Sequence, residues 1–122
     1  MTEQNKLVIV NSRGLDDERS SVAWTIASVA AASEMSVTMF LVSSGVDWAR
    51  RGAAAGAHLN PFDPTMNDMI SGFLENGGQI LVCPPCAKVR GYTDDCFIDG
   101  TIVAGSPALL EIVNGGAGTL TF

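Results

Sequence analysis

Apolar residues occur along the chain in short runs, and polar or glycine-rich segments separate these runs. The stretches "KLVIVN" (6–11) and "SVTMFLV" (36–42) are almost uninterrupted apolar runs. A run without alternation predicts a strand that is buried on both faces, as in a parallel sheet. Shorter runs follow at "QILV" (79–82), "TIVAG" (101–105) and "TLTF" (119–122). The pattern therefore predicts a mainly parallel sheet of about five strands.

Apolar residues at helical spacing fill the intervals between these strands. The first helix is predicted by one apolar face at i, i+4, i+7 and i+8, formed by Val22, Ile26, Val29 and Ala30. A second should start at Asp63-Pro64, and its apolar stripe is Met66, Met69, Ile70, Phe73 and Leu74. A third should start at Ser106-Pro107. Strands that alternate with helices predict one domain over residues 1–122, an α/β fold built as a three-layer α/β/α sandwich.

The loops that follow the predicted strands should meet at one edge of the sheet. In such sheets, ligands and reactive residues gather at the carboxyl ends of the strands. The segments at this edge are 12–16, 43–48, 83–86 and 105–107. Arg13 and Trp48 lie in the first two and are candidate pocket residues. Arg13 also fits a solvated loop, and Trp48 also fits a subunit interface.

Charge and composition exclude several classes of partner. The 122 residues carry a net charge of −6 and contain no run of Lys or Arg, so we expect no nucleic acid or anionic lipid as a partner. No apolar run approaches the ~20 residues of a membrane span. The start, "MTEQNKLVIV", does not have the pattern of a signal peptide. We therefore expect a cytoplasmic protein whose three cysteines are reduced.

The stretch "ILVCPPCAKVRG" (80–91) carries the most distinctive chemistry of the chain. Cys83 stands where a strand ends and a helix should begin, so the helix dipole and free N–H groups would favour its thiolate. Lys88 and Arg90 follow on the next turns and could add to this effect. Pro84 and Pro85 have no N–H and fix the backbone instead.

Three other interpretations of these cysteines stay open at this point. Cys83 could be a small buried apolar residue at the end of a strand. The C-x-x-C pair of Cys83 and Cys86 also suits thiol–disulfide exchange. Zinc would need Cys83, Cys86, Cys96 and the single His58, and no second paired ligand motif exists. We therefore expect neither a metal nor another cofactor.

The same stretch, extended to "ILVCPPCAKVRGY", resembles the DsrE/DsrF/TusD family of small sulfur-transfer proteins, which includes YchN-like proteins. The family arrangement is a strand, one cysteine, a short helix and a glycine eight residues on, and Cys83 and Gly91 match it. The segments "KLVIVNSRG", "SVTMFLVSSGV" and "DGTIVAGSPALLEIVNGGAGTLTF" resemble the family's other elements in the same order. The resemblance covers nearly the whole chain.

The resemblance implies a three-layer fold, assembly into homotrimers or homohexamers, and a thiol that carries sulfur as a persulfide. That role transfers to Cys83 alone, and makes the protein a sulfur carrier, or sulfurtransferase, with donor and acceptor proteins as partners. Cys86 and the two prolines depart from the family pattern, so whether Cys86 resolves the persulfide stays open. A C-x-x-C dithiol redox protein and a ligand-binding or regulatory module without catalysis are the alternative functions.

Overall fold

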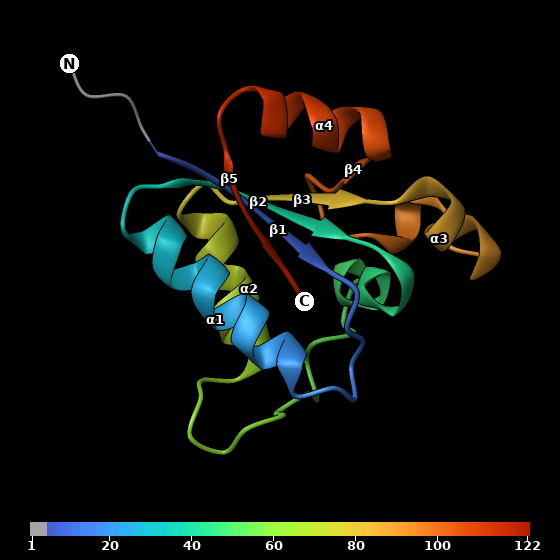
Figure 1. The fold of residues 1–122 in the computed structure, drawn as a ribbon. Coiled ribbons are helices and arrows are strands. Elements are labelled where there is room, and N and C mark those ends of the chain that lie inside the picture. The colour runs from blue at the N-terminus through green and yellow to red at the C-terminus, as the bar shows by residue number, and fades with distance from the viewer. Residues whose placement is uncertain (1–4) are drawn as a thin grey trace.

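A computed structural model describes residues 5–122 and contains one five-stranded sheet in which all neighbouring strands are parallel (Figure 1). Its strands are β1 (Lys6–Asn11), β2 (Ser36–Leu41), β3 (Gln79–Val82), β4 (Ile102–Val103) and β5 (Gly118–Thr121). Their order across the sheet is β4-β3-β2-β1-β5, which leaves β2 in the centre. The mainly parallel sheet of about five strands is confirmed.

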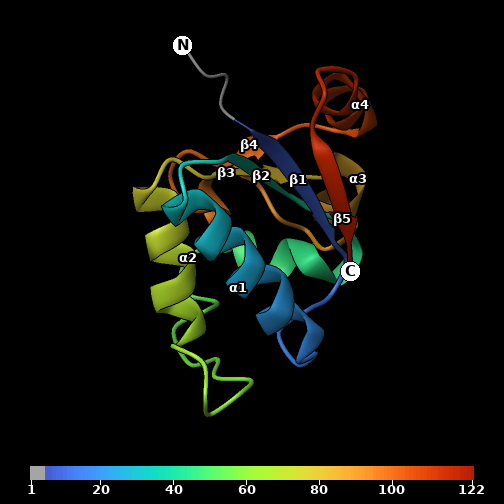
Figure 2. The same ribbon diagram turned by 60° about the vertical axis from the view of Figure 1, so that its left-hand side comes forward.

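Helices cover the two faces of this sheet unequally (Figures 1 and 2). The helices are α1 (Arg19–Ala32), α2 (Met66–Glu75), α3 (Pro84–Val89) and α4 (Ser106–Asn114), with 3-10 turns η1 (Ser43–Ala49) and η2 (Asp94–Cys96). Helices α1 and α2 pack on one face, and α4 lies on the other. The predicted α/β/α sandwich is therefore confirmed. Among residues 5–122, no helix is both long and apolar enough to span a bilayer.

The buried face of α1 differs from the predicted one. Val22 and Val29, which the spacing placed inside, are 48% and 59% exposed. The buried side consists of Ser20, Ser21, Ala23, Trp24, Ala27, Ala30 and Ala31. Small side chains let the helix lie close to the sheet, and Trp24 fills the space against Phe73 of α2, with ring centroids 5.5 Å apart. The prediction holds for Ala30, which is buried, and for Ile26, which is half-buried against the core. It was wrong for Val22 and Val29, because it left most of the small side chains of the helix out of the buried face.

Helix α2 buries the predicted stripe but begins later than predicted. Met66, Met69, Ile70 and Phe73 are buried, and Leu74 is half-buried. The helix starts at Met66, and the hydroxyl of Thr65 accepts the N–H of Asp68 at 3.1 Å. A threonine cap satisfies one of the free N–H groups of the first turn, so the Asp63-Pro64 start was wrong.

The C-terminal segment contributes little to the core of the single chain. The predicted strand at 101–105 pairs only through Ile102 and Val103. No residue from 98 to 122 is fully buried, although α4 packs with Val8, Phe40 and Leu81 through half-buried apolar residues such as Leu109 and Ile112. The main core therefore lies on the α1/α2 face of the sheet.

Candidate functional site

The carboxyl edge of the sheet brings the four predicted loops together. The N–H groups of Val42 and Cys83 bond to Asn11 and Leu41 of the preceding strands, at 3.1 and 3.0 Å. Gly14 lies against Ser44, since a Cβ at Gly14 would be 3.1 Å from that of Ser44. A Cβ at Gly105 would similarly be 3.6 Å from Cδ of Pro84. The edge is thus a continuous surface formed by backbone turns.

Cys83 is the residue at which β3 ends and α3 begins. It is the N-cap residue of α3, and Pro84 and Pro85 occupy the first helical positions. Proline suits these positions because its fixed φ matches the helix and its missing N–H would have no partner there. The Cys83 side chain is half-buried against Phe40, Leu81 and other apolar residues on the α4 face. The residue is therefore held in place and stays partly exposed to solvent.

Cys86 lies one turn further on, with its sulfur next to that of Cys83. The Cys86 thiol donates to Sγ of Cys83 at a distance of 3.0 Å. Sγ of Cys86 in turn accepts the backbone N–H of Ser43 at 3.2 Å. The guanidinium of Arg90 donates to the carbonyl oxygen of Cys86 at 3.0 Å. Both thiols are therefore fixed by neighbours from η1 and α3.

The electrostatics of Cys83 differ from the sequence-based expectation. Burial raises the pKa of the Cys83 thiol, and the neighbouring Cys86 side chain raises it further, because two thiolates 3.0 Å apart would repel each other. The backbone N–H of Cys86 acts in the opposite direction but does not reverse the shift. Neither Lys88 nor Arg90 contributes to it. The expected thiolate-favouring environment is therefore wrong for Cys83, because desolvation outweighs the helix terminus.

Three residues that sequence reasoning did not single out also belong to this edge. One is Ser43, through its N–H, and the others are Asp47 of η1 and Tyr92 after α3. The Tyr92 hydroxyl donates to the Asp47 carboxylate at 2.5 Å, which raises the pKa of Tyr92. The guanidinium of Arg50 lies 5.1 Å from the centre of the Tyr92 ring. Their signal in the sequence was their place in the segments that follow β2 and α3.

Comparison with known proteins decides the family. The model of the DsrE/DsrF-like family matches residues 4–122. The chain belongs to the DsrE/DsrF-like family. Curated relatives are uncharacterized archaeal proteins: MJ0760 of Methanocaldococcus jannaschii is 27% identical over 93% of this chain, and MJ0989 of the same organism is 28% identical over 94%. The chain spans 42% of the length of MJ0760 and 96% of MJ0989.

Solved structures share the fold of this DsrE/DsrF-like chain. The ychN protein from E. coli has a TM-score of 0.79 at 19% identity, and the alignment covers 98% of this chain and all of that one. MTH1491 from Methanobacterium thermoautotrophicum, a protein of unknown function, has a TM-score of 0.73 at 15% identity, covering 98% of this chain and 100% of its own. At these identities the likeness establishes the fold.

The two candidate pocket residues of this DsrE/DsrF-like chain have different surroundings. Trp48 is fully buried, and its indole N–H donates to the Arg13 carbonyl at 2.9 Å and to the Ser20 hydroxyl at 3.0 Å. Its assignment to a pocket wall or an interface was therefore wrong, because η1 turns the ring inward. The Arg13 guanidinium stays partly exposed, 3.7 Å from Asp17. Lys88 is exposed on α3.

The remaining residues of the zinc hypothesis lie in other surroundings. Cys96 Sγ is 3.5 Å from the Thr93 hydroxyl, and Nε2 of His58 is 3.0 Å from the Asp63 carbonyl oxygen. Across residues 5–122, no three His, Cys, Asp or Glu side chains gather where they could hold a metal ion.

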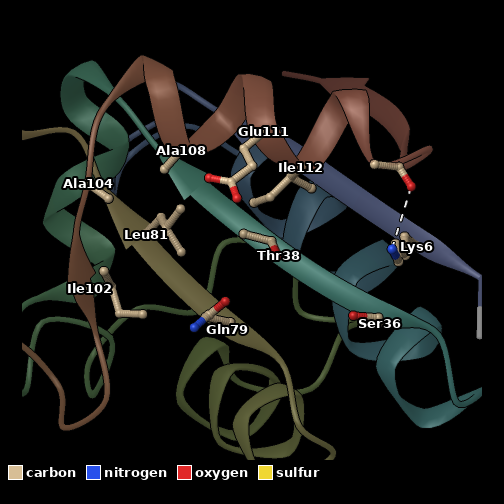
Figure 3. Close-up of a pocket in the computed structure, with 11 residues that line it drawn as sticks. Lys6, Ser36, Thr38, Gln79, Leu81, Ile102, Ala104, Ala108, Glu111 and Ile112 are labelled. Carbon is tan, nitrogen blue, oxygen red and sulfur yellow. Dashed lines mark hydrogen bonds between the residues drawn. The ribbon is translucent and has the colours of Figure 1, made fainter.

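A separate hollow of about 440 Å³ lies between α4 and the sheet (Figure 3). Its floor is formed by Thr38, Gln79 and Leu81, and Glu111 and Ile112 of α4 lie above it. Lys6 stands at its far end and donates to the Gly115 carbonyl at 3.5 Å. Ala104 and Ala108 line the hollow and also pack in the apolar cluster that contains Cys83. The hollow therefore opens on the same face of the sheet as the thiol.

Proposed function

We propose that this protein is a sulfur carrier in which Cys83 holds sulfane sulfur as a persulfide. The observation that carries the proposal is the partly exposed Cys83 at the carboxyl edge of a DsrE/DsrF-like sheet. Membership of this family is generally associated with sulfur relay. Its position at the end of β3 fits the rule that reactive groups of parallel sheets stand at this edge.

The chemistry needs two thiol exchange steps and no cofactor. The Cys83 thiolate attacks the outer sulfur of a donor persulfide, forms the new S–S bond, and the donor leaves as a thiolate. An acceptor thiolate then attacks the outer sulfur of the Cys83 persulfide, and Cys83 leaves as a thiolate. Each step breaks one S–S bond and forms another, so no external electrons are required.

The raised pKa of Cys83 has a consequence for loading. Less thiolate is present at neutral pH than for an ordinary cysteine, so the rate of spontaneous loading should rise steeply as the pH increases. A donor protein that docks on this edge and supplies a positive charge would lift this restriction. The carrier would thus take sulfur from its own donor in preference to other persulfides.

The partners that this function needs are further copies of the chain and two kinds of protein. We propose that copies assemble into a homotrimer or homohexamer. One kind of partner delivers a persulfide to the carboxyl edge, and the other presents an acceptor thiol there. Lys88, exposed on α3, is available to contact an acidic group on either partner.

Intact mass after incubation with inorganic polysulfide tests the carrier function. We expect a gain of one sulfur that a reductant reverses, and peptide mapping should place it on Cys83. Cys83→Ser should abolish the gain and leave the unfolding midpoint nearly unchanged, because the residue is half-buried in a turn. Cys96→Ala, which removes a cysteine remote from the pair, should load like the wild type. Loading that persists in Cys83→Ser would refute the proposal.

A second function, dithiol–disulfide exchange, is favoured by the 3.0 Å between the two sulfurs. In that case a mild oxidant would remove two hydrogens from the protein and leave a Cys83–Cys86 disulfide. Intact mass of Cys86→Ala separates the two functions, because this variant cannot close the disulfide: a carrier still gains the mass of one sulfur, and a protein that acts only by dithiol exchange gains none. The mass of a non-catalytic binding module would show neither the gain of one sulfur nor the loss of two hydrogens.

A further inference from the structure

The two cysteines reach each other from different layers of the molecule. Cys83 packs with the apolar residues under α4, whereas Cys86 packs with the cluster under α1 and α2. Their sulfurs nevertheless stand 3.0 Å apart at the edge of the sheet. We propose that Cys86 is the discharging thiol of the carrier: it attacks the Cys83 persulfide, closes a Cys83–Cys86 disulfide and releases hydrosulfide. This inference rests on the proposed function.

The neighbours of Cys86 suit an attacking sulfur. The N–H of Ser43 points at its Sγ from 3.2 Å, so a backbone dipole is available to stabilise negative charge on that atom. Ser43 has φ of 51°, a conformation that residues other than glycine seldom adopt. Such backbone outliers gather at functional sites, where the surrounding structure holds them. Arg90 fixes the Cys86 backbone through its carbonyl oxygen.

Disulfide closure is compatible with the backbone of this turn. Cys86 is one turn of α3 beyond Cys83, so both side chains lie on one side of the helix entrance. A disulfide requires the sulfurs to approach to about 2.05 Å. The sulfurs already stand 3.0 Å apart, so closure needs them to approach by only about 1 Å more.

The discharge step balances without an external oxidant. The Cys86 thiolate forms a bond to Sγ of Cys83, and the bond between that sulfur and the outer sulfur breaks. The outer sulfur leaves with the electron pair and its proton, as hydrosulfide. Sulfane sulfur is reduced to sulfide while the two cysteine thiols are oxidised to a disulfide. A small dithiol reductant restores the pair for another cycle.

Cys86 and an acceptor therefore compete for the same persulfide at different atoms. The acceptor thiolate attacks the outer sulfur, which projects away from Cys86 in the geometry that S–S exchange requires. Cys86 attacks the inner sulfur from the opposite side. A docked acceptor receives sulfur, whereas an unused persulfide is converted to sulfide. The pair thus limits how long the carrier stays loaded.

Persulfide decay in the wild type and in Cys86→Ala tests this role. Each protein is loaded with inorganic polysulfide, freed of donor by gel filtration without oxygen, and followed by intact mass and sulfide release. The wild type should release one sulfide per persulfide and end two hydrogens lighter than the reduced protein. In Cys86→Ala the persulfide should last at least roughly tenfold longer, because a held thiol has a high effective concentration. Cys96→Ala, the matched control, should decay like the wild type.

The outcomes separate this inference from the proposed function. Equal decay rates in the wild type and Cys86→Ala, with no Cys83–Cys86 disulfide, would overturn the discharging role and leave the carrier intact. No loading in any variant that keeps Cys83 would overturn both. Cys86→Ser preserves the size of the side chain and gives the same comparison if the alanine variant unfolds.

Discussion

Tyr92 is the single tyrosine of the chain, so its ionisation can be followed without interference. The hydrogen bond to Asp47 raises its pKa, and partial burial adds to the shift. We predict that the phenolate absorbance appears above the ordinary value of about 10, and that Asp47→Asn moves the transition to lower pH. Stability from this bond is present below the unfolded pKa and is lost as the pH rises through the folded one. If Tyr92 of the wild type ionised at the ordinary value of about 10, the Asp47–Tyr92 hydrogen bond would be contradicted.

The thiol pair gives a second prediction at the scale of single residues. Because the side chain of Cys86 raises the pKa of Cys83, Cys86→Ala should shift the pH midpoint of Cys83 alkylation to lower pH. The midpoint is measured by peptide mapping after timed alkylation over a pH series. Cys96→Ala leaves the pair intact and should keep the wild-type midpoint. An unchanged midpoint in Cys86→Ala would show that the two thiols do not interact.

Single residues of the site were predictable to different degrees. Cys83 could be found because a cysteine that directly follows an apolar run marks the carboxyl end of a strand. The role of Ser43 could not, because it acts through a backbone N–H whose direction depends on the turn that follows β2. The direction of the Cys83 pKa shift could not be predicted from the sequence either, because it depends on how far the thiol is buried.

At the scale of elements, the start of η1 is held against the end of β1 by a glycine. A Cβ at Gly45 would lie 2.2 Å from the Asn11 carbonyl oxygen, so Gly45→Ala must push these two backbones apart. We predict a loss of about 1–3 kcal/mol in the free energy of unfolding, by overpacking. Because η1 also carries Ser43 and Asp47, Gly45→Ala should disturb the Asp47–Tyr92 hydrogen bond. The ionisation of Tyr92 in this variant should therefore move to lower pH.

A glycine in α2 provides the matched control. A Cβ at Gly72 would meet nothing within 4 Å, so Gly72→Ala should stabilise the protein by about 0.5–1 kcal/mol through helix propensity. Urea unfolding midpoints of the two variants and the wild type give both values. A Gly45→Ala midpoint at or above that of the wild type would show that β1 and η1 are not in close contact.

Elements were predicted best where side chains of one kind dominate. The long apolar runs gave β1 and β2 to within one residue, because a strand covered on both faces needs apolar residues at every position. The inward face of α1 was missed because alanines and serines bury it, and periodicity gives little weight to small residues. The length of the fourth strand was overestimated, since "TIVAG" continues directly into the cap of α4.

At the scale of the whole molecule, the two faces of the sheet are covered unequally. Two helices and most of the buried core lie on one face, and α4 alone covers the other (Figure 2). Within residues 5–122, five of the nine large exposed apolar residues fall within β4, α4 and β5, namely Ile102, Val103, Leu110, Val113 and Leu120. Ile102 and Val103 stand on one edge strand and Leu120 on the other, whereas Leu110 and Val113 share one face of α4. Exposed apolar residues on one helix face are suited to a protein–protein contact.

We therefore predict that the chain self-associates through α4. Leu110, 58% exposed on α4, should lie in the contact, so Leu110→Glu should place a charge in an apolar interface and dissociate the assembly. Val29, 59% exposed on α1, is the matched control because it is equally open and lies on the opposite face. Val29→Glu should leave the assembly intact. Light scattering after size exclusion, at micromolar concentration, measures the mass of each variant. A monomeric wild type would refute self-association, and dissociation by Val29→Glu alone would place the contact on α1 instead.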